Sequence, residues 1–311
     1  MAVKFIGFGF MPYMDLPEDF DEKYSSVWVD IPKKLYDPEK GYEMYHEFLD
    51  EFEFMVDMGF DGVGVNEHHS DAACLMPSPN LMASILARKV RHSNTALLVL
   101  GNSIALYNPP IRIAEEGAML DVLSGGKFIQ GFPVGTSMDA NYVYGISPAE
   151  LRERYHEAHD LIIKCWKEDE IFSWNGKYNQ LRYVNPWPTP IQKPHPPVWI
   201  PGGGSVETYE FTIKNNYQFS YLSFNGWERA KKVLGPYWEL VQELGAEMNP
   251  YRVGLTQTIL VSETDERAKQ DYEKHIRYFI EKGGHINPRY AEAPGYRTLK
   301  SLRATDLRAQ W

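Results

Sequence analysis

Short apolar runs of strand length alternate with amphipathic stretches of helical length along most of this 311-residue chain. This alternation builds a parallel sheet, because each helix carries the chain back to the start of the next strand. No internal repeat and no change in composition marks a domain boundary, so we predict a single α/β domain over residues 1–311. The predicted strands cover residues 3–10, 62–66, 95–100, 128–132, 198–201, 218–223 and 254–261.

Four residue pairs give start signals for the helices between these strands. Each pair places a capping side chain before a proline, whose fixed φ suits the first helical position. The pairs are Asp37-Pro38, Ser78-Pro79, Asn108-Pro109 and Ser147-Pro148. Apolar spacing extends the last of these into a helix near 148–168 and predicts further helices near 227–244 and 265–283.

Two segments interrupt the alternation, and in barrels such insertions usually form loops over one end. The first covers residues 15–37. The second covers residues 170–197, where Asn175-Gly176 between aromatic runs predicts a tight hairpin turn before a proline-rich stretch. We expect both segments to shape the substrate pocket. The aromatic content of 14% favours an apolar or planar substrate.

The composition excludes several classes of function. A formal net charge of -10 argues against nucleic acid as a partner, because phosphate binding needs clustered lysine and arginine. No apolar run approaches the roughly 20 residues that cross a bilayer, and the first residues lack a secretory cleavage site. Two cysteines, Cys74 and Cys165, lie far apart without metal-type spacing. We therefore expect a cytoplasmic protein that binds a small molecule and neither membrane nor nucleic acid.

The most informative cluster is Asn66-Glu67-His68-His69, directly after the second predicted strand. In parallel α/β folds, side chains at the carboxyl ends of the strands surround a common active site. Histidine transfers protons near neutral pH, and a neighbouring carboxylate can orient it or raise its pKa. His68 and Glu67 are therefore the candidate catalytic residues. A structural role stays open, and so does a metal site, although adjacent histidines on a strand end point in opposite directions.

A glycine-rich turn, Gly202-Gly203-Gly204-Ser205, follows the fifth predicted strand and precedes a predicted helix. Glycines let backbone N–H groups approach an anion closely, and a helix N-terminus adds partial positive charge, so the turn suits a terminal phosphate. A plain tight turn is the alternative interpretation. Asn102-Ser103 and Gly135-Thr136 follow the third and fourth predicted strands, and we assign them to the same cofactor-binding rim.

Taken together, these residues resemble the luciferase-like flavin-dependent monooxygenases over nearly the whole chain. The matching stretches are Gly59-Phe60-Asp61-Gly62 leading into Glu67-His68-His69, then Leu123-Ser124-Gly125-Gly126-Lys127, and Pro197-Val198-Trp199-Ile200 with the glycine turn. The resemblance implies a TIM-like (β/α)8 barrel that holds FMN at its carboxyl rim. It also implies that a separate reductase supplies reduced FMN and that O2 adds at the flavin C4a position, forming a peroxyflavin that oxygenates a small organic substrate.

The resemblance also implies roles for individual residues. His68 matches the catalytic histidine of the family, and Asn102-Ser103 matches a non-proline cis peptide beside the flavin ring. Gly203, Gly204 and Ser205 fall in the phosphate-binding turn.

The phosphate-binding region departs from the family pattern at one position. The catalytic subunit of bacterial luciferase has an arginine in the strand-four loop, where this chain has Val134. The backbone turn or another cation must then neutralise the phosphate, and Arg152 and Arg154 are the candidates.

Three alternative functions stay open. Related barrels bind a deazaflavin and transfer hydride without oxygen. A metal-assisted TIM-barrel hydrolase could use Glu67, His68 and His69. A flavin-binding protein could keep the pocket without turnover.

The C-terminal part of the chain contains no candidate for an eighth strand. Residues 284–311 contain Pro288, Pro294 and Gly295 and no apolar run that could be buried between two neighbouring strands. We therefore expect a barrel whose eighth strand is missing from this chain and a natural protein that continues further. The open strand edges would favour pairing with another chain, and we expect a homo-oligomer.

Overall fold

The computed structural model describes residues 2–135, 137–222 and 226–291. Its centre is a parallel sheet of seven strands in the order β1-β2-β3-β4-β7-β8-β9. The predicted parallel α/β fold of the barrel type is thereby confirmed. The strands are β1 Ile6–Phe8, β2 Gly62–Val65, β3 Ala96–Val99, β4 Phe128–Gly131, β7 Val198–Gly202, β8 Gln218–Tyr221 and β9 Val253–Leu255.

The central strands are buried on both faces, as expected where helices cover a parallel sheet. Val63, Leu97 and Val99 are fully buried in a cluster with the helices around them. On the opposite face, a Cβ at Gly64 would lie 3.1 Å from the ring of Phe8 and 3.4 Å from Leu98. Glycine at this position therefore lets larger neighbours on the adjacent strands fill the inner face.

The two edge strands are shorter than predicted. Three residues form β1 and three form β9, whereas the alternating apolar pattern predicted eight for each, over residues 3–10 and 254–261. An edge strand pairs with one neighbour only, so residues beyond the partner's register have no ladder to join.

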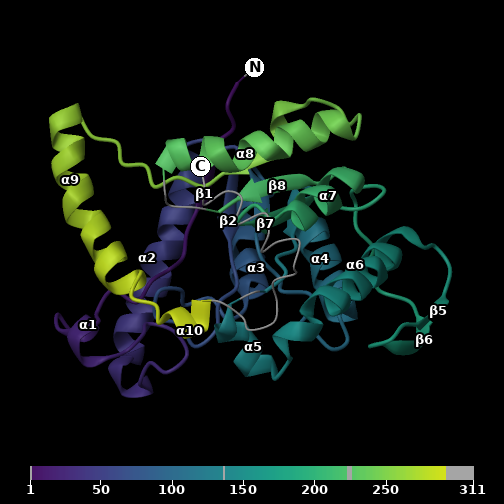
Figure 1. Cartoon of the computed structure of the whole chain (residues 1–311), viewed down its shortest axis with the longest axis horizontal. Coiled ribbons are helices and arrows are strands. Elements are labelled where there is room, and N and C mark those ends of the chain that lie inside the picture. Colours follow the sequence, from purple (N-terminus) through teal and green to yellow (C-terminus); the bar gives the residue numbers. More distant parts are fainter. Residues whose placement is uncertain (1, 136, 223–225, 292–311) are drawn as a thin grey trace.

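Helices cover the sheet and its ends (Figure 1). The predicted helices near 148–168, 227–244 and 265–283 are present as α6, α8 and α9, the last ending in a π-helical turn over Phe279–Gly283. The helices are α1 Phe20–Lys23, α2 Pro38–Asp57, α3 Pro79–Val90, α4 Ile111–Ser124, α5 Met138–Tyr144, α6 Leu151–Lys167, α7 Val206–Lys214, α8 Gly226–Glu243, α9 Asp265–Tyr278 and α10 Pro288–Ala291.

The start signals were correct at Asp37-Pro38 and Ser78-Pro79, and Ser147-Pro148 starts a 3-10 turn, Pro148–Glu150, that leads directly into α6. Asp37 caps α2 by accepting a hydrogen bond from Glu39 N (2.9 Å). The start predicted at Asn108-Pro109 is wrong, because α4 begins at Ile111 with Pro110 as its N-cap. A residue that precedes proline is disfavoured in helical conformation, so the second proline moves the start two residues along.

The hairpin predicted in residues 170–197 is present as β5 Phe172–Asn175 and β6 Gln180–Val184, joined by residues 176–179 rather than by a two-residue turn. Glu157 on α6 accepts from the backbone N–H of Asn179 (2.8 Å) and holds the hairpin on the outer side of that helix. In Figure 1 the hairpin and α9 lie at opposite ends of the molecule.

The end of the second insertion, around Gln192, lies at the amino edge of the sheet, and the role of this insertion in shaping the substrate pocket stays a prediction. The backbone N–H of Gln192 donates a hydrogen bond to the carboxylate of Asp121, near the end of α4 (2.9 Å). Its side-chain amide donates to the carbonyl of Phe128, the first residue of β4 (2.7 Å). Those contacts lie at the amino edge. A segment between a helix and the following strand returns to this edge, whereas a segment between a strand and the following helix lies at the other.

The first insertion, residues 15–37, follows β1 and therefore lies at the carboxyl edge. Its Val27 N–H donates to His285 O (2.8 Å), and Trp28 forms an antiparallel bridge with Asp71. A cavity of about 200 Å³ lies beneath this segment and is lined mainly by apolar and aromatic side chains. Its lining includes Tyr13, Leu16, Val29, Ile31, Tyr36 and Asp71.

Between Leu255 and Ala291 the described chain contains no further strand, as the prediction of a missing eighth strand requires. The rest of the tail in that prediction, residues 292–311, lies outside the described residues. None of the described helices combines the length and the apolar character that a membrane crossing requires.

Candidate active site

The parallel strands bring four predicted segments to one edge of the sheet. The cluster 66–69 follows β2, Asn102-Ser103 follows β3, Gly135 follows β4, and Gly202 ends β7. Because all these strands point the same way, their carboxyl ends lie along a common rim. Thr136, the remaining predicted residue of this rim, lies outside the described residues.

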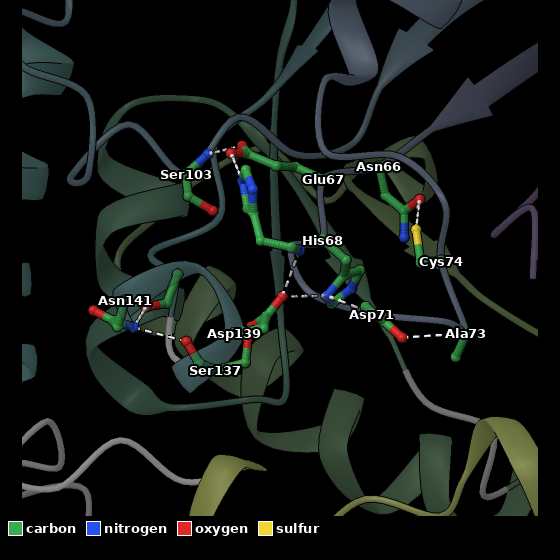
Figure 2. Close-up of polar contacts among 12 residues, drawn as sticks. Asn66, Glu67, His68, Asp71, Ala73, Cys74, Ser103, Ser137, Asp139 and Asn141 are labelled. Carbon is green, nitrogen blue, oxygen red and sulfur yellow. Dashed lines mark hydrogen bonds and ion pairs between the residues drawn. The ribbon is translucent and has the colours of Figure 1, made fainter. Parts of the chain in front are cut away.

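Glu67 is the buried anchor of this rim. Its side chain has no exposed surface, and it accepts a hydrogen bond from Ser103 N (2.9 Å) and from the hydroxyl of Tyr107 (3.1 Å). It also pairs with His69 Nε2 (2.8 Å) and accepts from the Tyr144 hydroxyl (3.4 Å). Figure 2 shows its carboxylate directed toward Ser103. Glu67 therefore orients His69, whereas the sequence placed it as the partner of His68.

His68 has a different partner, Asp139 of α5. The Asp139 Oδ2 lies 3.0 Å from His68 Nδ1 and accepts from the backbone N–H of His69 (3.1 Å). A second carboxylate, Asp71, has its Oδ2 3.9 Å from the same ring nitrogen (Figure 2). The ring of Trp28 packs on the imidazole at 5.5 Å between centroids, and 22% of the His68 side chain stays exposed.

Burial and charge act in opposite directions on these groups. Burial lowers the pKa of His68, but the hydrogen bond to Asp139 and the charges of Asp71 and Asp139 outweigh it, so the pKa is raised. Burial raises the pKa of Asp139, yet the hydrogen bond and charge of His68 hold it at about 2. Burial raises the pKa of Asp71 to about 7 despite the opposing charge of His68. Asp139 is thus the permanent anion, and Asp71 titrates near neutral pH.

The prediction of a cis bond between Asn102 and Ser103 is wrong, since the cis bonds of the described residues all precede proline. The backbone here satisfies its own polar groups. Ser103 N–H donates to Glu67, and Asn102 O accepts from Ile104 N (2.8 Å). A non-proline cis bond costs about 3 kcal/mol, and these contacts do not enforce one.

The glycine turn leads directly into α7. Ser205 is the N-cap residue, and its hydroxyl accepts from Thr208 N (3.3 Å). Gly204 has φ +103°, and a Cβ there would lie 2.5 Å from Val233 Cγ1. A Cβ at Gly203 would have no atom of the described residues within 4 Å. The backbone at Gly203 therefore faces open space, whereas Gly204 is required by packing and by its conformation.

Asp139, Asp71 and Trp28 belong to this site and were missed in the sequence. Asp139 lies 71 positions after His68, and its one signal was an acidic residue in the first turn of a short helix after β4. Asp71 lies only two residues after His69, so no pattern in the sequence indicated a role for it apart from that of the histidine cluster. Among the described residues, no group of three or more histidine, cysteine or acidic side chains could hold a metal ion.

Comparison with known proteins identifies the family. The family model described as luciferase-like monooxygenase matches residues 29–310. The chain belongs to this family. Its members include oxidoreductases that use a flavin, and the resemblance seen in the sequence is confirmed.

One curated relative is the oxygenase component of a flavin-dependent trigonelline monooxygenase from Acinetobacter baylyi, 27% identical over 209 residues. The match covers 66% of this chain and 56% of that protein, so the chain spans little more than half of the relative's length.

Two solved structures share the fold of this family member. One is the oxygenating constituent of 3,6-diketocamphane monooxygenase from Pseudomonas putida in complex with FMN, with TM-score 0.70, 20% identity, and coverage of 90% of this chain and 74% of that one. The other is an F420-dependent secondary alcohol dehydrogenase, with TM-score 0.63, 16% identity, and coverage of 98% and 82%.

We expect Glu67→Gln to destabilise the protein. The amide keeps the shape of the side chain but replaces one acceptor oxygen with a donor, which leaves a buried N–H or hydroxyl without its acceptor. Such a loss costs about 1–3 kcal/mol, measurable by urea unfolding. Glu150→Gln is the control, because it removes only a surface ion pair with Arg154 and should change stability by less than about 1 kcal/mol. Equal stability of both variants would show that Glu67 does not anchor the rim.

Proposed function

We propose that the protein is the oxygenase of a two-component system that uses reduced FMN and O2 to oxygenate a small organic substrate. The observation that carries the proposal is the shared carboxyl rim, where the His68–Asp139 pair and the turn Gly202–Ser205 follow neighbouring parts of one parallel sheet. Family membership supports a flavin at such a rim, and the trigonelline relative is named as an oxygenase component.

The residues present fit FMN at two places. The open space at Gly203 allows a phosphate to approach the backbone before α7, whose N-terminus favours an anion. Inside the barrel, the Trp199 Nε1 donor is buried and has no hydrogen-bond partner among the described residues. A flavin ring carries acceptors at its polar edge, so the isoalloxazine would provide the partner that this indole lacks.

The chain's own residues would position the reactants and move protons. When bound, reduced FMN would supply the electrons that activate O2. Asp139 fixes the imidazole of His68 through Nδ1, so that Nε2 is the atom available to exchange a proton. Trp28 packs on the same ring and limits access of water to one side.

Of the two candidate cations for the phosphate, Arg152 is the better placed. Arg154 pairs with Glu150 and lies over the ring of Tyr178 on the hairpin side (4.2 Å to the centroid). Arg152 lowers the pKa of His156, after the larger effect of burial, and the ring of His156 contacts Phe211 on α7. We therefore assign Arg152 to the phosphate end of the site.

The cavity beneath residues 15–37 is our proposed substrate pocket. It borders Asp71, whose carboxylate faces His68, and its walls are mostly apolar and aromatic. A volume of about 200 Å³ suits a small organic molecule. A separate reductase and a cytoplasmic location complete the proposal, and both Cys74 and Cys165 are free thiols.

We expect the protein to bind FMN, and Gly203→Asp to weaken binding at least tenfold, or about 1.4 kcal/mol, because the carboxylate repels the phosphate. Fluorescence titration with FMN measures the effect. Gly203→Asn is the matched control, since it adds the same bulk without charge to the same open space. Equal FMN affinity of the two variants would show that this turn does not bind the phosphate.

The identity of the cofactor has its own test. Greater thermal stabilisation of the protein by a reduced deazaflavin than by reduced FMN would favour the hydride-transfer alternative, to which the F420-dependent neighbour points.

We also expect His68→Ala to keep FMN affinity and to lower the oxygenated product formed per flavin oxidised. General acid–base groups contribute roughly 10² to 10⁴ in rate, so the loss is large enough to measure by product analysis with reduced FMN, O2 and candidate substrates. His92→Ala, at an exposed position in the turn after α3, should behave as the wild type. If the His68 variant formed as much oxygenated product per flavin oxidised as the wild type, the role of this histidine would be structural.

A homo-oligomer is the remaining part of the proposal. Large apolar side chains are exposed on the neighbouring helices α3 and α4, where Leu81 is 63%, Ile85 45% and Met119 48% exposed. Apolar groups gathered on adjacent elements are typical of a protein interface.

We expect Ile85→Lys combined with Met119→Lys to dissociate the oligomer, because each buried lysine would bring an unpaired charge into the contact. Light scattering coupled to size-exclusion chromatography measures the mass. Ile171→Lys, at an exposed position before the hairpin, is the control and should leave the mass unchanged. A monomeric wild type would contradict the proposal.

A further inference from the structure

Two carboxylates face the same nitrogen of His68. Asp139 Oδ2 lies 3.0 Å from Nδ1 and Asp71 Oδ2 lies 3.9 Å from it, and the side chains of both acids are 1% exposed. This arrangement is more than is needed to orient a ring, because one acceptor already sets the direction of an N–H. Above its pKa of about 7, the second carboxylate adds negative charge at the position where a protonated imidazole is stabilised most.

The hydrogen bonds define which proton stays on the ring. Asp139 Oδ2 also accepts from the backbone N–H of His69, so it is held as an acceptor, and Nδ1 must donate to it. No hydrogen bond to Nε2 is found within the described residues. In the neutral imidazole, Nε2 would then be a base, and in the imidazolium it would carry the one N–H free to donate.

The other titratable groups near His68 do not reverse this charge balance. Glu67 adds negative charge from the same loop, although its oxygens are engaged by His69 and Ser103. Cys74 lies beside Asp71 with its pKa raised by burial, so it is a neutral thiol.

The elements packed over His68 add no unpaired cation that the structure describes there. On the segment that carries Trp28, Asp30 pairs with Arg289 of α10 at 3.2 Å. On α5, Tyr144 packs its ring on His69 at 5.3 Å. The field at the His68 ring is therefore negative on its Nδ1 side.

We propose that His68 enters the reaction as an imidazolium, with Asp139 and Asp71 as positioning residues that keep it charged so that Nε2–H acts as a general acid. This inference rests on the proposed function. The proton leaves Nε2 for an oxygen that gains negative charge in the reaction, and the electron pair of the N–H bond stays on nitrogen. The Nδ1–H remains bonded to Asp139, and solvent returns the Nε2 proton to the ring.

The charge state of His68 can be measured without cofactor or turnover. Histidine labelled with ¹⁵N and ¹³C is followed by NMR through a pH titration of the apoprotein, and the His68 signals are assigned by their loss in His68→Gln. We expect the midpoint of His68 to lie above 6.5, the ordinary value for histidine. Asp139→Asn and Asp71→Asn should each lower the midpoint, with the larger shift for Asp139, because it is at hydrogen-bond distance and stays ionised throughout the titration, whereas Asp71 is ionised only above its pKa of about 7.

A matched control is Asp160→Asn, which removes the carboxylate beside His159 Nδ1 (2.9 Å) and should leave His68 unchanged. A wild-type midpoint at or below 6.5, or a midpoint unmoved in both variants, would overturn the proposal. If one variant does not fold, the titrations of the wild type and of the other variant still test the proposal. The ¹⁵N shifts add an independent test, because a neutral His68 protonated at Nε2 instead of Nδ1 would contradict the assigned donor.

The titration also separates this inference from the proposed function. Failure of the wild type to bind FMN would refute the proposed function and leave the histidine midpoint as measured. In the functioning enzyme, both aspartate variants should lose product yield at lower pH than the wild type. The sign follows from the raised pKa, since the charged acid is fully present below the ordinary histidine pKa and is lost as pH rises through the folded-state value.

Discussion

Parallel pairing of β2, β3 and β4 is the constraint on which the rest of the structure depends. Its register places Val65 opposite Val99, and Val99 opposite Gln130, so the three strands end at nearly the same height. The residues that follow each strand are then neighbours, although dozens of positions separate them in the chain. The contact from Ser103 N–H to Glu67, and the contact from Asp139 to His68, are both consequences of this alignment.

The rim concentrates ionisable groups that would be costly to bury separately. Glu67, Asp71 and Asp139 have almost no exposed side-chain surface, and burial of an unpaired carboxylate is strongly unfavourable. The fold reduces this cost by assigning each acid its own donors. The backbone N–H of Ser103 and two tyrosine hydroxyls serve Glu67, the backbone N–H of Ala73 serves Asp71, and the His68 imidazole with a backbone N–H serves Asp139. The same adjacent histidines thereby enter two separate networks.

Much of the fold could be predicted from the sequence, because buried strands and capped helices leave local signals. The runs at β2 and β3 are apolar over their full length, and Asp37-Pro38 is itself the start of a helix, with Asp37 as its cap. Local patterns could not assign partners across the chain. Glu67 is adjacent to His68 in sequence, yet alternation along the backbone directs it to His69, and the true partner, Asp139, lies on a helix that no pattern connects to it. The cis bond predicted at Asn102 came from resemblance alone, and nothing in the sequence tested the loop around it.

The place of the β5–β6 hairpin has a consequence for how this protein can change. It is attached to the outside of α6 through Glu157, and the stretch after it closes the amino edge through Gln192. The candidate active site and the contacts of Gln192 thus lie at opposite edges of one sheet. Substitutions at the hairpin's exposed positions Ser173, Asn175 and Lys177 can accumulate, or a label can be attached there, without disturbing the geometry around His68. The exposed side of the hairpin is therefore a site where substitutions, whether natural or engineered, leave the candidate active site intact.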